Sequence, residues 1–147
     1  MIAHSVEILI VEDNPDDLEL ALHALKKHNL ANNIHIARDG QEALDYIFGK
    51  ENDVPQQLNH RPRVILLDLK LPKVDGLDVL KRIKSDQRTR SIPVVILTSS
   101  REERDIIESY ALGVNSYIVK PVDFEKFTEA IRTLKMYWLL LNQPPAL

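Results

Sequence analysis

The stretch RVILLDLKLPKVDGLDVLKRIK (residues 63–84) decides how this sequence folds. It begins with the apolar run 64–67, which has the length and the aliphatic composition of a buried strand. Farther along, apolar residues recur three residues apart over 77–83, which is typical of one face of a helix. The stretch therefore predicts a strand, a loop and a helix, with the carboxylate of Asp68 at the tip of the strand.

Four other apolar runs share this length and composition, at residues 6–11, 34–37, 94–97 and 116–119. Helical patterns of apolar residues lie between the runs. Strands and helices that alternate in this way form βαβ units on a parallel sheet, and near-continuous apolar strands indicate helices on both faces. The expected fold is α/β, a doubly wound five-stranded parallel sheet with the flavodoxin-like strand order 2-1-3-4-5. The mostly polar residues 49–62 predict a surface loop of unassigned role.

The composition excludes several classes of protein. The chain has 147 residues, of which 44% are hydrophobic and 28% are charged, and these values predict one soluble domain over residues 1–147. The net charge of −3 gives no basic field for nucleic acid or membrane. The chain has no Cys, which excludes disulfides and fits a cytoplasmic protein. No apolar run approaches the ~20 residues of a membrane span, and the N-terminus lacks a signal-peptide pattern.

Residues that can carry chemistry follow four of the predicted strands. Glu12 and Asp13 follow the first strand, Asp68 the third, Thr98 the fourth and Lys120 the fifth. In an open α/β sheet, ligands bind outside the carboxyl ends of the strands, where the strand order reverses. This point lies between the first and third strands, so the fold gathers three carboxylates. Two charges ~4 Å apart repel by about 4 kcal/mol at an effective dielectric constant of 20, so a divalent cation or an ammonium group has to compensate them.

These residue types fit a carboxylate that receives a phosphoryl group. Mg²⁺ prefers a few carboxylates, a carbonyl and water, and the Thr98 hydroxyl and Lys120 ammonium groups can donate to an anion on Asp68. Each residue alone has a simpler interpretation: Asp68 as a turn residue, Thr98 as part of a helix cap, and Lys120 as a surface charge. Asp13 or the following Asn14 can likewise cap the next helix. The joint occurrence of these residues at adjacent tips favours a site.

The motifs ILIVEDNPDD, VILLDLKLPKVDGLDVLKRIK, IPVVILTSS and NSYIVKPVD resemble those of receiver domains, the response regulators of two-component signalling. The resemblance covers residues 8 to about 134. More narrowly, LLDLKLPKVDGLDVLKRIK, LTSSREERDIIESYALGVNSYIVKPVDF and the C-terminal MYWLLLNQPP resemble the short regulators that are paired with cyanobacterial-type and bacterial phytochromes.

The resemblance implies a magnesium-dependent phosphoryl acceptor. Asp68 would accept the phosphoryl group from a sensor histidine kinase, which the narrower resemblance identifies as a phytochrome. Asp13, Asp68 and the backbone carbonyl of Lys70 would coordinate Mg²⁺, and Glu12 would hold a metal-bound water. The chain would be no enzyme, since it would catalyse only its own phosphotransfer and dephosphorylation.

The resemblance also implies a switch. Thr98 would be the switch hydroxyl, Lys120 would contact the phosphoryl group, and Tyr117 would be the aromatic residue that turns inward on activation. An ordinary half-buried strand tyrosine is the alternative for Tyr117. Lys70 and Ser100 flank the path of the hydrolytic water, and Lys70 departs from the common pattern because it is a cation. The lifetime of the phosphorylated form is therefore left open.

Apolar residues crowd the C-terminal end of the chain. One face of the last predicted helix covers the sheet and consists of Phe124, Phe127, Ile131, Leu134 and Trp138. Five further apolar side chains point elsewhere: Met136, Tyr137, Leu139, Leu140 and Leu141. Monomers rarely leave so dense a patch in water. Residues 136–147 are therefore expected to extend beyond a core of about 6–135 and to form a homodimer through the C-terminal helix, unless the last turn folds back on its own domain.

Three other functions share parts of this pattern. A phosphatase of the haloacid dehalogenase type needs a second carboxylate two residues after its nucleophile, where this chain has Lys70. A flavodoxin needs a Ser/Thr- and Gly-rich phosphate loop after the first strand, where the acidic VEDNPDD would repel a phosphate. A receiver-like scaffold with a degenerate site is the third, and the retention of all key side-chain types argues against it. With no effector domain after the last helix, output is expected through contact with an unknown downstream protein.

Overall fold

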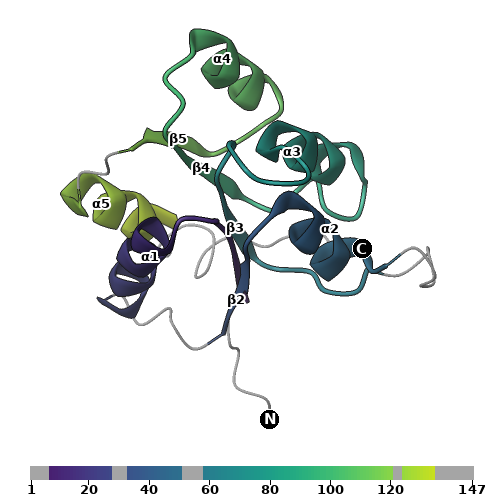
Figure 1. The fold of residues 1–147 in the computed structure, drawn as a ribbon, viewed down its shortest axis with the longest axis horizontal. Helices are drawn as coiled ribbons and strands as arrows, with labels where there is room; N and C mark the ends of the chain where they lie inside the picture. The colour runs from purple at the N-terminus through teal and green to yellow at the C-terminus, as the bar shows by residue number, and fades with distance from the viewer. Residues whose placement is uncertain (1–6, 28–32, 51–57, 121–123, 135–147) are drawn as a thin grey trace.

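A computed structural model of the chain describes residues 7–27, 33–50, 58–120 and 124–134 (Figure 1). Strands and helices alternate along the chain. The strands are β1 (Ile8–Val11), β2 (Ile34–Ala37), β3 (Val64–Leu67), β4 (Val94–Thr98) and β5 (Ser116–Val119). The helices are α1 (Pro15–Lys27), α2 (Gly40–Phe48), α3 (Gly76–Ser85), α4 (Glu103–Ala111) and α5 (Phe124–Leu134). Among these described helices, none is long and apolar enough to span a membrane.

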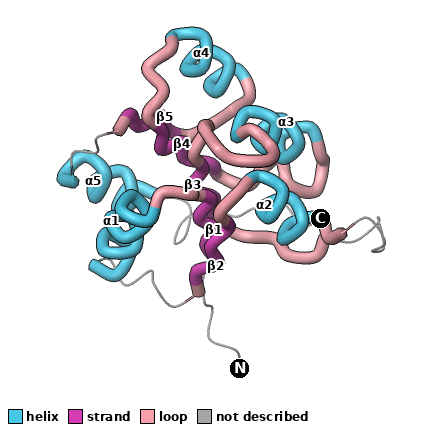
Figure 2. The backbone as a smooth tube through the Cα atoms, in the orientation of Figure 1, coloured by secondary structure: helices cyan, strands magenta, loops and turns pink. Residues whose placement is uncertain are grey.

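The five strands form one parallel sheet in the order β2-β1-β3-β4-β5. Helices α1 and α5 lie on one side of this sheet, whereas α2 and α3 lie on the other, with α4 beside α3 near β5 (Figures 1 and 2). In the register of β1 and β3, Val11 lies opposite Leu67, so the next residues, Glu12 and Asp68, leave the sheet side by side. The structure confirms the doubly wound α/β fold and the strand order that the sequence predicts.

Alternate residues of the central strands face two separate hydrophobic clusters. Leu9 and Val11 pack with the inner residues of α2 and α3, whereas Ile8 and Ile10 pack with α1 and with Phe127 of α5. All four residues of β1 are buried, and each such burial stabilises the fold by about 1.5–3 kcal/mol. Burial on both faces explains why the strand is a continuous apolar run rather than an alternating one.

The boundaries of the elements differ from the sequence predictions at a few places. β1 begins at Ile8 rather than at residue 6, which lies outside the described residues, and β4 extends by one residue to Thr98. In the predicted loop 49–62, the described end is tied to the core, since Asn59 N donates to Ile47 O at 2.8 Å. The predicted dimer contact at 136–147 lies outside the described residues.

Helix α4 forms where its apolar residues predict a helix, but two of those residues do not face the core. Ile107 is 61% exposed and Tyr110 is 51% exposed. The buried side chains of this helix are instead those of Asp105 and Ser109, which are four residues apart and therefore lie on one face. The buried side chains of α4 are therefore polar rather than apolar.

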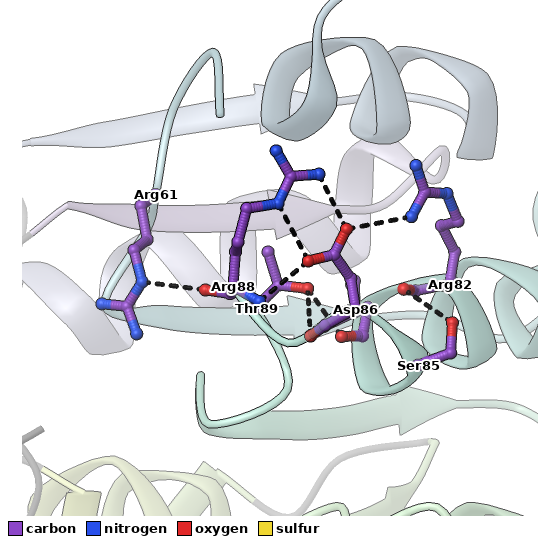
Figure 3. A network of polar contacts seen from close by, with 7 residues as sticks. Arg61, Arg82, Ser85, Asp86, Arg88 and Thr89 are labelled. Atoms are coloured by element: carbon purple, nitrogen blue, oxygen red, sulfur yellow. Dashed lines mark hydrogen bonds and ion pairs between the residues drawn. The ribbon is translucent and has the colours of Figure 1, made fainter. Parts of the chain in front are cut away.

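A network of charged side chains fixes the connection between α3 and β4 (Figure 3). The Asp86 carboxylate accepts hydrogen bonds from Arg88 Nε at 3.0 Å and Arg88 Nη2 at 2.8 Å, and from Arg82 Nη1 at 3.3 Å. Arg61 Nε donates to the Arg88 carbonyl at 3.1 Å, and the Thr89 hydroxyl donates to the carbonyl at the end of α3 at 2.6 Å. These contacts fix the path by which the chain enters β4, whose other end carries Thr98.

Candidate functional site

Three carboxylates gather at the carboxyl ends of β1 and β3. The backbone fixes two of them, because Glu12 N donates to Ala37 O at 2.9 Å and Asp68 N donates to Val11 O at 3.1 Å. Glu12 is 3% exposed and Asp68 is 5% exposed, whereas Asp13 is exposed. One carboxylate oxygen from each of Glu12, Asp13 and Asp68 lies within 4.8 Å of the other two. The structure thus brings together the acidic residues that the sequence places at these tips.

Lys120 reaches into this cluster from the end of β5. Its ammonium group lies 2.8 Å from Glu12 Oε1, 3.0 Å from Asp68 Oδ2 and 2.7 Å from Asp17 Oδ2. Burial lowers the pKa of Lys120, but the hydrogen bonds with these three carboxylates outweigh burial and raise the pKa above its usual value. The backbone of Lys120 is held by Thr98, whose carbonyl accepts from Lys120 N at 2.8 Å. Lys120 is therefore the ammonium group that the crowded carboxylates require.

The acidic cluster retains electrostatic strain despite Lys120. Burial raises the pKa of Glu12 to about 7; the hydrogen bond with Lys120 opposes this shift, and the charge of Asp68 adds to it. A hard divalent cation would relieve this repulsion. The donor set fits one, since Mg²⁺ and Mn²⁺ prefer carboxylate and carbonyl oxygens. The backbone of Lys70 is also at the cluster, because Lys70 N donates to Asp68 Oδ1 at 3.1 Å.

Asn14 rather than Asp13 caps the helix that follows β1. Its Oδ1 atom accepts hydrogen bonds from Asp16 N at 2.9 Å and Asp17 N at 3.1 Å, and Pro15 is the first residue of α1. Of the two caps that the sequence leaves open, Asn14 is the one that forms. This arrangement leaves the Asp13 carboxylate at the acidic cluster.

Thr98 and Tyr117 are linked through Ser100 in the loop that follows β4. Thr98 is fully buried, and its Oγ1 accepts from Ser100 N at 3.3 Å. The half-buried Tyr117 donates its hydroxyl hydrogen to the Ser100 carbonyl at 3.1 Å, and burial raises the pKa of this tyrosine. Thr98 does not cap α4, whose N-cap is Glu102 without a side-chain cap bond. The loop thus connects the hydroxyl at the tip of β4 to the aromatic ring on β5.

A glycine allows α3 to begin directly against the backbone of Asp68. A Cβ atom added at Gly76 would lie 2.2 Å from the Asp68 carbonyl oxygen and 2.4 Å from Leu69 Cα, and Gly76 N donates to Leu69 O at 2.9 Å. Any other residue would push the helix away from the strand tip. The glycine in the motif VDG therefore helps to hold Asp68 in place.

The sequence predictions missed two acidic residues. Asp17 contacts Lys120 from the first turn of α1, and its place in the acidic stretch that follows the first strand could have indicated that it lies near the site. Asp105 is 3% exposed and contacts both Ser100 and Lys70. The sequence indicated a role for Asp105 only weakly. The one indication was its spacing of four residues from another polar residue, Ser109, on a helix that was predicted from its apolar residues.

Comparisons with known proteins agree with this geometry. The family model of the response regulator receiver domain matches residues 8–132. The bacteriophytochrome response regulator AtBRR is 54% identical, with 96% of this chain and 100% of that chain covered and a TM-score of 0.72. The phosphorylated cyanobacterial phytochrome response regulator RcpA is 38% identical, with 98% of this chain and 100% of that chain covered and a TM-score of 0.79.

A third relative is the response regulator Rcp1 of Synechocystis. It is 37% identical over 139 residues, which cover 95% of this chain and 92% of Rcp1. The structure of the Mn(2+)-bound form of Rcp1 has a TM-score of 0.75 to this chain, with 96% of this chain and 99% of that chain covered. Fold, site geometry and sequence agree, and the chain belongs to the response regulator receiver domain family.

Proposed function

We propose that this chain is a response regulator that accepts a phosphoryl group on Asp68 from a sensor histidine kinase. The observation that carries the proposal is the position of Asp68, which is held at the end of β3 with Lys120 Nζ 3.0 Å from its Oδ2 atom. In the transfer, a carboxylate oxygen forms a bond to phosphorus while the phosphorus–nitrogen bond of a phosphohistidine breaks. The electron pair of that bond returns to the imidazole nitrogen of the kinase.

Glu12, Asp13, Asp68 and the backbone carbonyl of Lys70 would hold Mg²⁺ in this reaction. The support is the 4.8 Å cluster of carboxylate oxygens and the Mn(2+)-bound form of the related Rcp1. The cation supplies positive charge that neutralises the phosphoryl oxygens as they approach the carboxylates. The residues of the chain orient Asp68 and hold its carboxylate beside the Lys120 ammonium group.

Lys120 and Thr98 would then bind the transferred group. The Lys120 ammonium is already at Asp68 and would exchange its carboxylate contacts for phosphoryl oxygens. The Thr98 hydroxyl would donate to another oxygen, which would draw the loop at Ser100 toward the site. Because Tyr117 is hydrogen-bonded to the Ser100 carbonyl, this movement would release the ring, which would act as the switch. Output would follow by contact with a downstream protein.

The kinase would be a phytochrome, and the transfer would take place in the cytoplasm. The 54% identity to AtBRR and the 38% identity to RcpA, both of which are phytochrome response regulators, support this choice. The proposal includes a homodimer through the C-terminal residues 136–147, on the strength of the apolar side chains there.

The proposal is tested by phosphotransfer. A phytochrome histidine kinase labelled with radioactive ATP should lose its label to this chain within seconds to minutes in the presence of Mg²⁺, and Asp68→Asn should take up none. Glu103→Gln replaces an exposed acidic residue on α4. It is the matched control and should accept the label normally. Transfer from unrelated histidine kinases but not from phytochromes would contradict the choice of kinase; absence of transfer from every kinase would contradict the function.

A further inference from the structure

A buried carboxylate outside the acidic cluster joins three segments near the strand tips. Asp105 lies in the first turn of α4, with 4% of its side chain exposed. It accepts a hydrogen bond from the hydroxyl of Ser100, in the loop after β4. Its Oδ2 atom also lies 3.7 Å from the ammonium nitrogen of Lys70, in the loop after β3. A charge buried this deeply needs such partners, so both contacts stabilise the carboxylate of Asp105.

The side chain of Lys70 begins beside one carboxylate, that of Asp68, and ends beside another, that of Asp105. Its amide nitrogen donates to Asp68 Oδ1 at 3.1 Å, so its chain begins beside the candidate phosphoryl acceptor. Its side chain is 53% exposed and ends at Asp105 instead. A lysine carries a flexible four-carbon stem, and rotation about this stem would carry the ammonium group from one carboxylate toward the other. The contact with Asp105 is therefore not imposed by the backbone of Lys70.

The negative charge at Asp68 determines which anion the ammonium group of Lys70 contacts. In the structure, Lys120 already compensates Asp68, with its ammonium at 3.0 Å, whereas Lys70 is the cation that is paired with Asp105. A phosphoryl group on Asp68 adds negative charge and oxygens that accept hydrogen bonds strongly. This new anion competes with Asp105 for Lys70.

We propose that Asp105 is a positioning residue that holds the Lys70 ammonium group away from Asp68 until a phosphoryl group on Asp68 competes for it. The inference rests on the proposed function of Asp68. Asp105 thereby weakens binding of the anion, because the Lys70–Asp105 ion pair has to break before Lys70 can contact the phosphoryl oxygens. When the Lys70–Asp105 ion pair breaks, α4 also loses one of its contacts with the loops at the strand tips.

The test is a calorimetric titration with beryllium fluoride, a mimic of the phosphoryl group, in the presence of Mg²⁺. Asp105→Asn keeps the shape of the side chain and removes its charge, so the affinity should rise by about two- to five-fold, the range for a half-exposed ion pair. Loss of any nearby negative charge also favours an anion. The same substitution is therefore made in a Lys70→Met background, where the affinity should rise by less, because only this general effect remains and no ammonium group is released.

Glu103→Gln is the matched control, because it removes an exposed charge from the same turn of α4 and should leave the affinity unchanged. The inference is overturned if Asp105→Asn has no effect, or if its effect is equal in both backgrounds. A parent chain that binds no beryllium fluoride, or an Asp68→Asn variant that binds as tightly as the parent, would overturn the proposed function itself. The two failures are therefore distinguishable.

A measurement on the parent chain avoids any dependence on the folding of Asp105→Asn. With isotope-labelled lysine, the side-chain resonance of Lys70 is identified as the one that is missing from Lys70→Met. This resonance should shift when beryllium fluoride and Mg²⁺ are added, because the ammonium group leaves Asp105. An unchanged Lys70 resonance alongside a bound anion would overturn the inference.

Discussion

The ammonium group of Lys120 lies within 3.0 Å of oxygens of Glu12, Asp17 and Asp68, where carboxylate repulsion would otherwise be strong. Only 11% of the Lys120 side chain is exposed, so water screens these charges weakly. The three acidic residues come from the end of β1, the first turn of α1 and the end of β3. A single lysine directly after β5 thus holds these three segments together.

Replacement of Lys120 by Met would leave these carboxylates without their counter-charge. The free energy of unfolding, measured by urea denaturation in EDTA, should fall by about 3 kcal/mol, the cost of breaking a buried ion pair from one side. Addition of Mg²⁺ should restore part of this loss, because a divalent cation compensates the same carboxylates. Lys26→Met, at an exposed position near the end of α1, is the control. An equal loss in both variants would contradict the role given to Lys120.

Some site residues could be predicted from the sequence and others could not, because different features of the fold determine their positions. Topology alone brings Glu12, Asp68 and Lys120 to one end of the sheet, since each directly follows a parallel strand. Asp17 and Asp105 lie on helices, where their contacts depend on the rotation of the helix and on side-chain conformation. Neither quantity can be derived from strand order, so these two residues emerged from the structure.

At the scale of an element, α4 shows that the sequence can predict a helix without predicting which of its faces is buried. The apolar residues of this helix predict that it exists, but Ile107 is 61% exposed and the buried face carries Asp105 and Ser109. The hydroxyl of Ser109 is fully buried and has no hydrogen-bond partner in the described part of the chain. A helix whose inner face is polar and incompletely satisfied is held weakly.

The charged network between α3 and β4 should make the free energy of unfolding depend on pH in the acidic range. The side-chain hydrogen bonds of Arg88 lower the pKa of Asp86 below its usual value of 3.8, so this carboxylate is more acidic in the folded chain than in the unfolded one. Its contribution to stability is therefore present above about pH 4 and is lost as the pH falls below that value. Hydrogen bonds to a charged group contribute about 1.5–3 kcal/mol.

Urea denaturation at about pH 6 and about pH 3 measures this contribution. Asp86→Asn should lower the free energy of unfolding at the higher pH and should lower it by less at the lower pH, because the contribution of the carboxylate falls progressively between its unfolded and its folded pKa. Asp78→Asn, at an exposed position in α3, the helix that Asp86 follows, should have a small effect at both pH values. A loss for Asp86→Asn that is the same at both pH values would contradict the account, because it would show that charge is not what stabilises this connection.

For the whole molecule, the sequence predicted the fold well because strand burial is encoded locally. The apolar runs 34–37, 64–67 and 116–119 coincide with β2, β3 and β5, and the alternation of strands with helices is enough to predict a parallel, doubly wound sheet. Element ends were less predictable. Thr98 belongs to β4 although its side chain is polar, because its backbone continues the pairing with β5.

A further prediction for the whole molecule concerns its assembly. A chain that stops after Lys135 lacks the apolar side chains of 136–147, and it should sediment as a monomer, whereas the full chain should sediment as a dimer at micromolar concentration. Both are compared with and without beryllium fluoride, to show whether the assembly responds to the site. A full chain that is monomeric in both states, or a shortened chain that still dimerises, would contradict the proposed dimer.

The proposed function requires that Asp68 accepts the phosphoryl group and that this step depends on a divalent cation. Intact-mass spectrometry after incubation with acetyl phosphate tests it most directly. The parent chain should gain the mass of one phosphoryl group with Mg²⁺ and none with EDTA, and Asp68→Asn should stay unmodified in both. Labelling of Asp68→Asn to the same extent as the parent, or labelling that persists in EDTA, would contradict it.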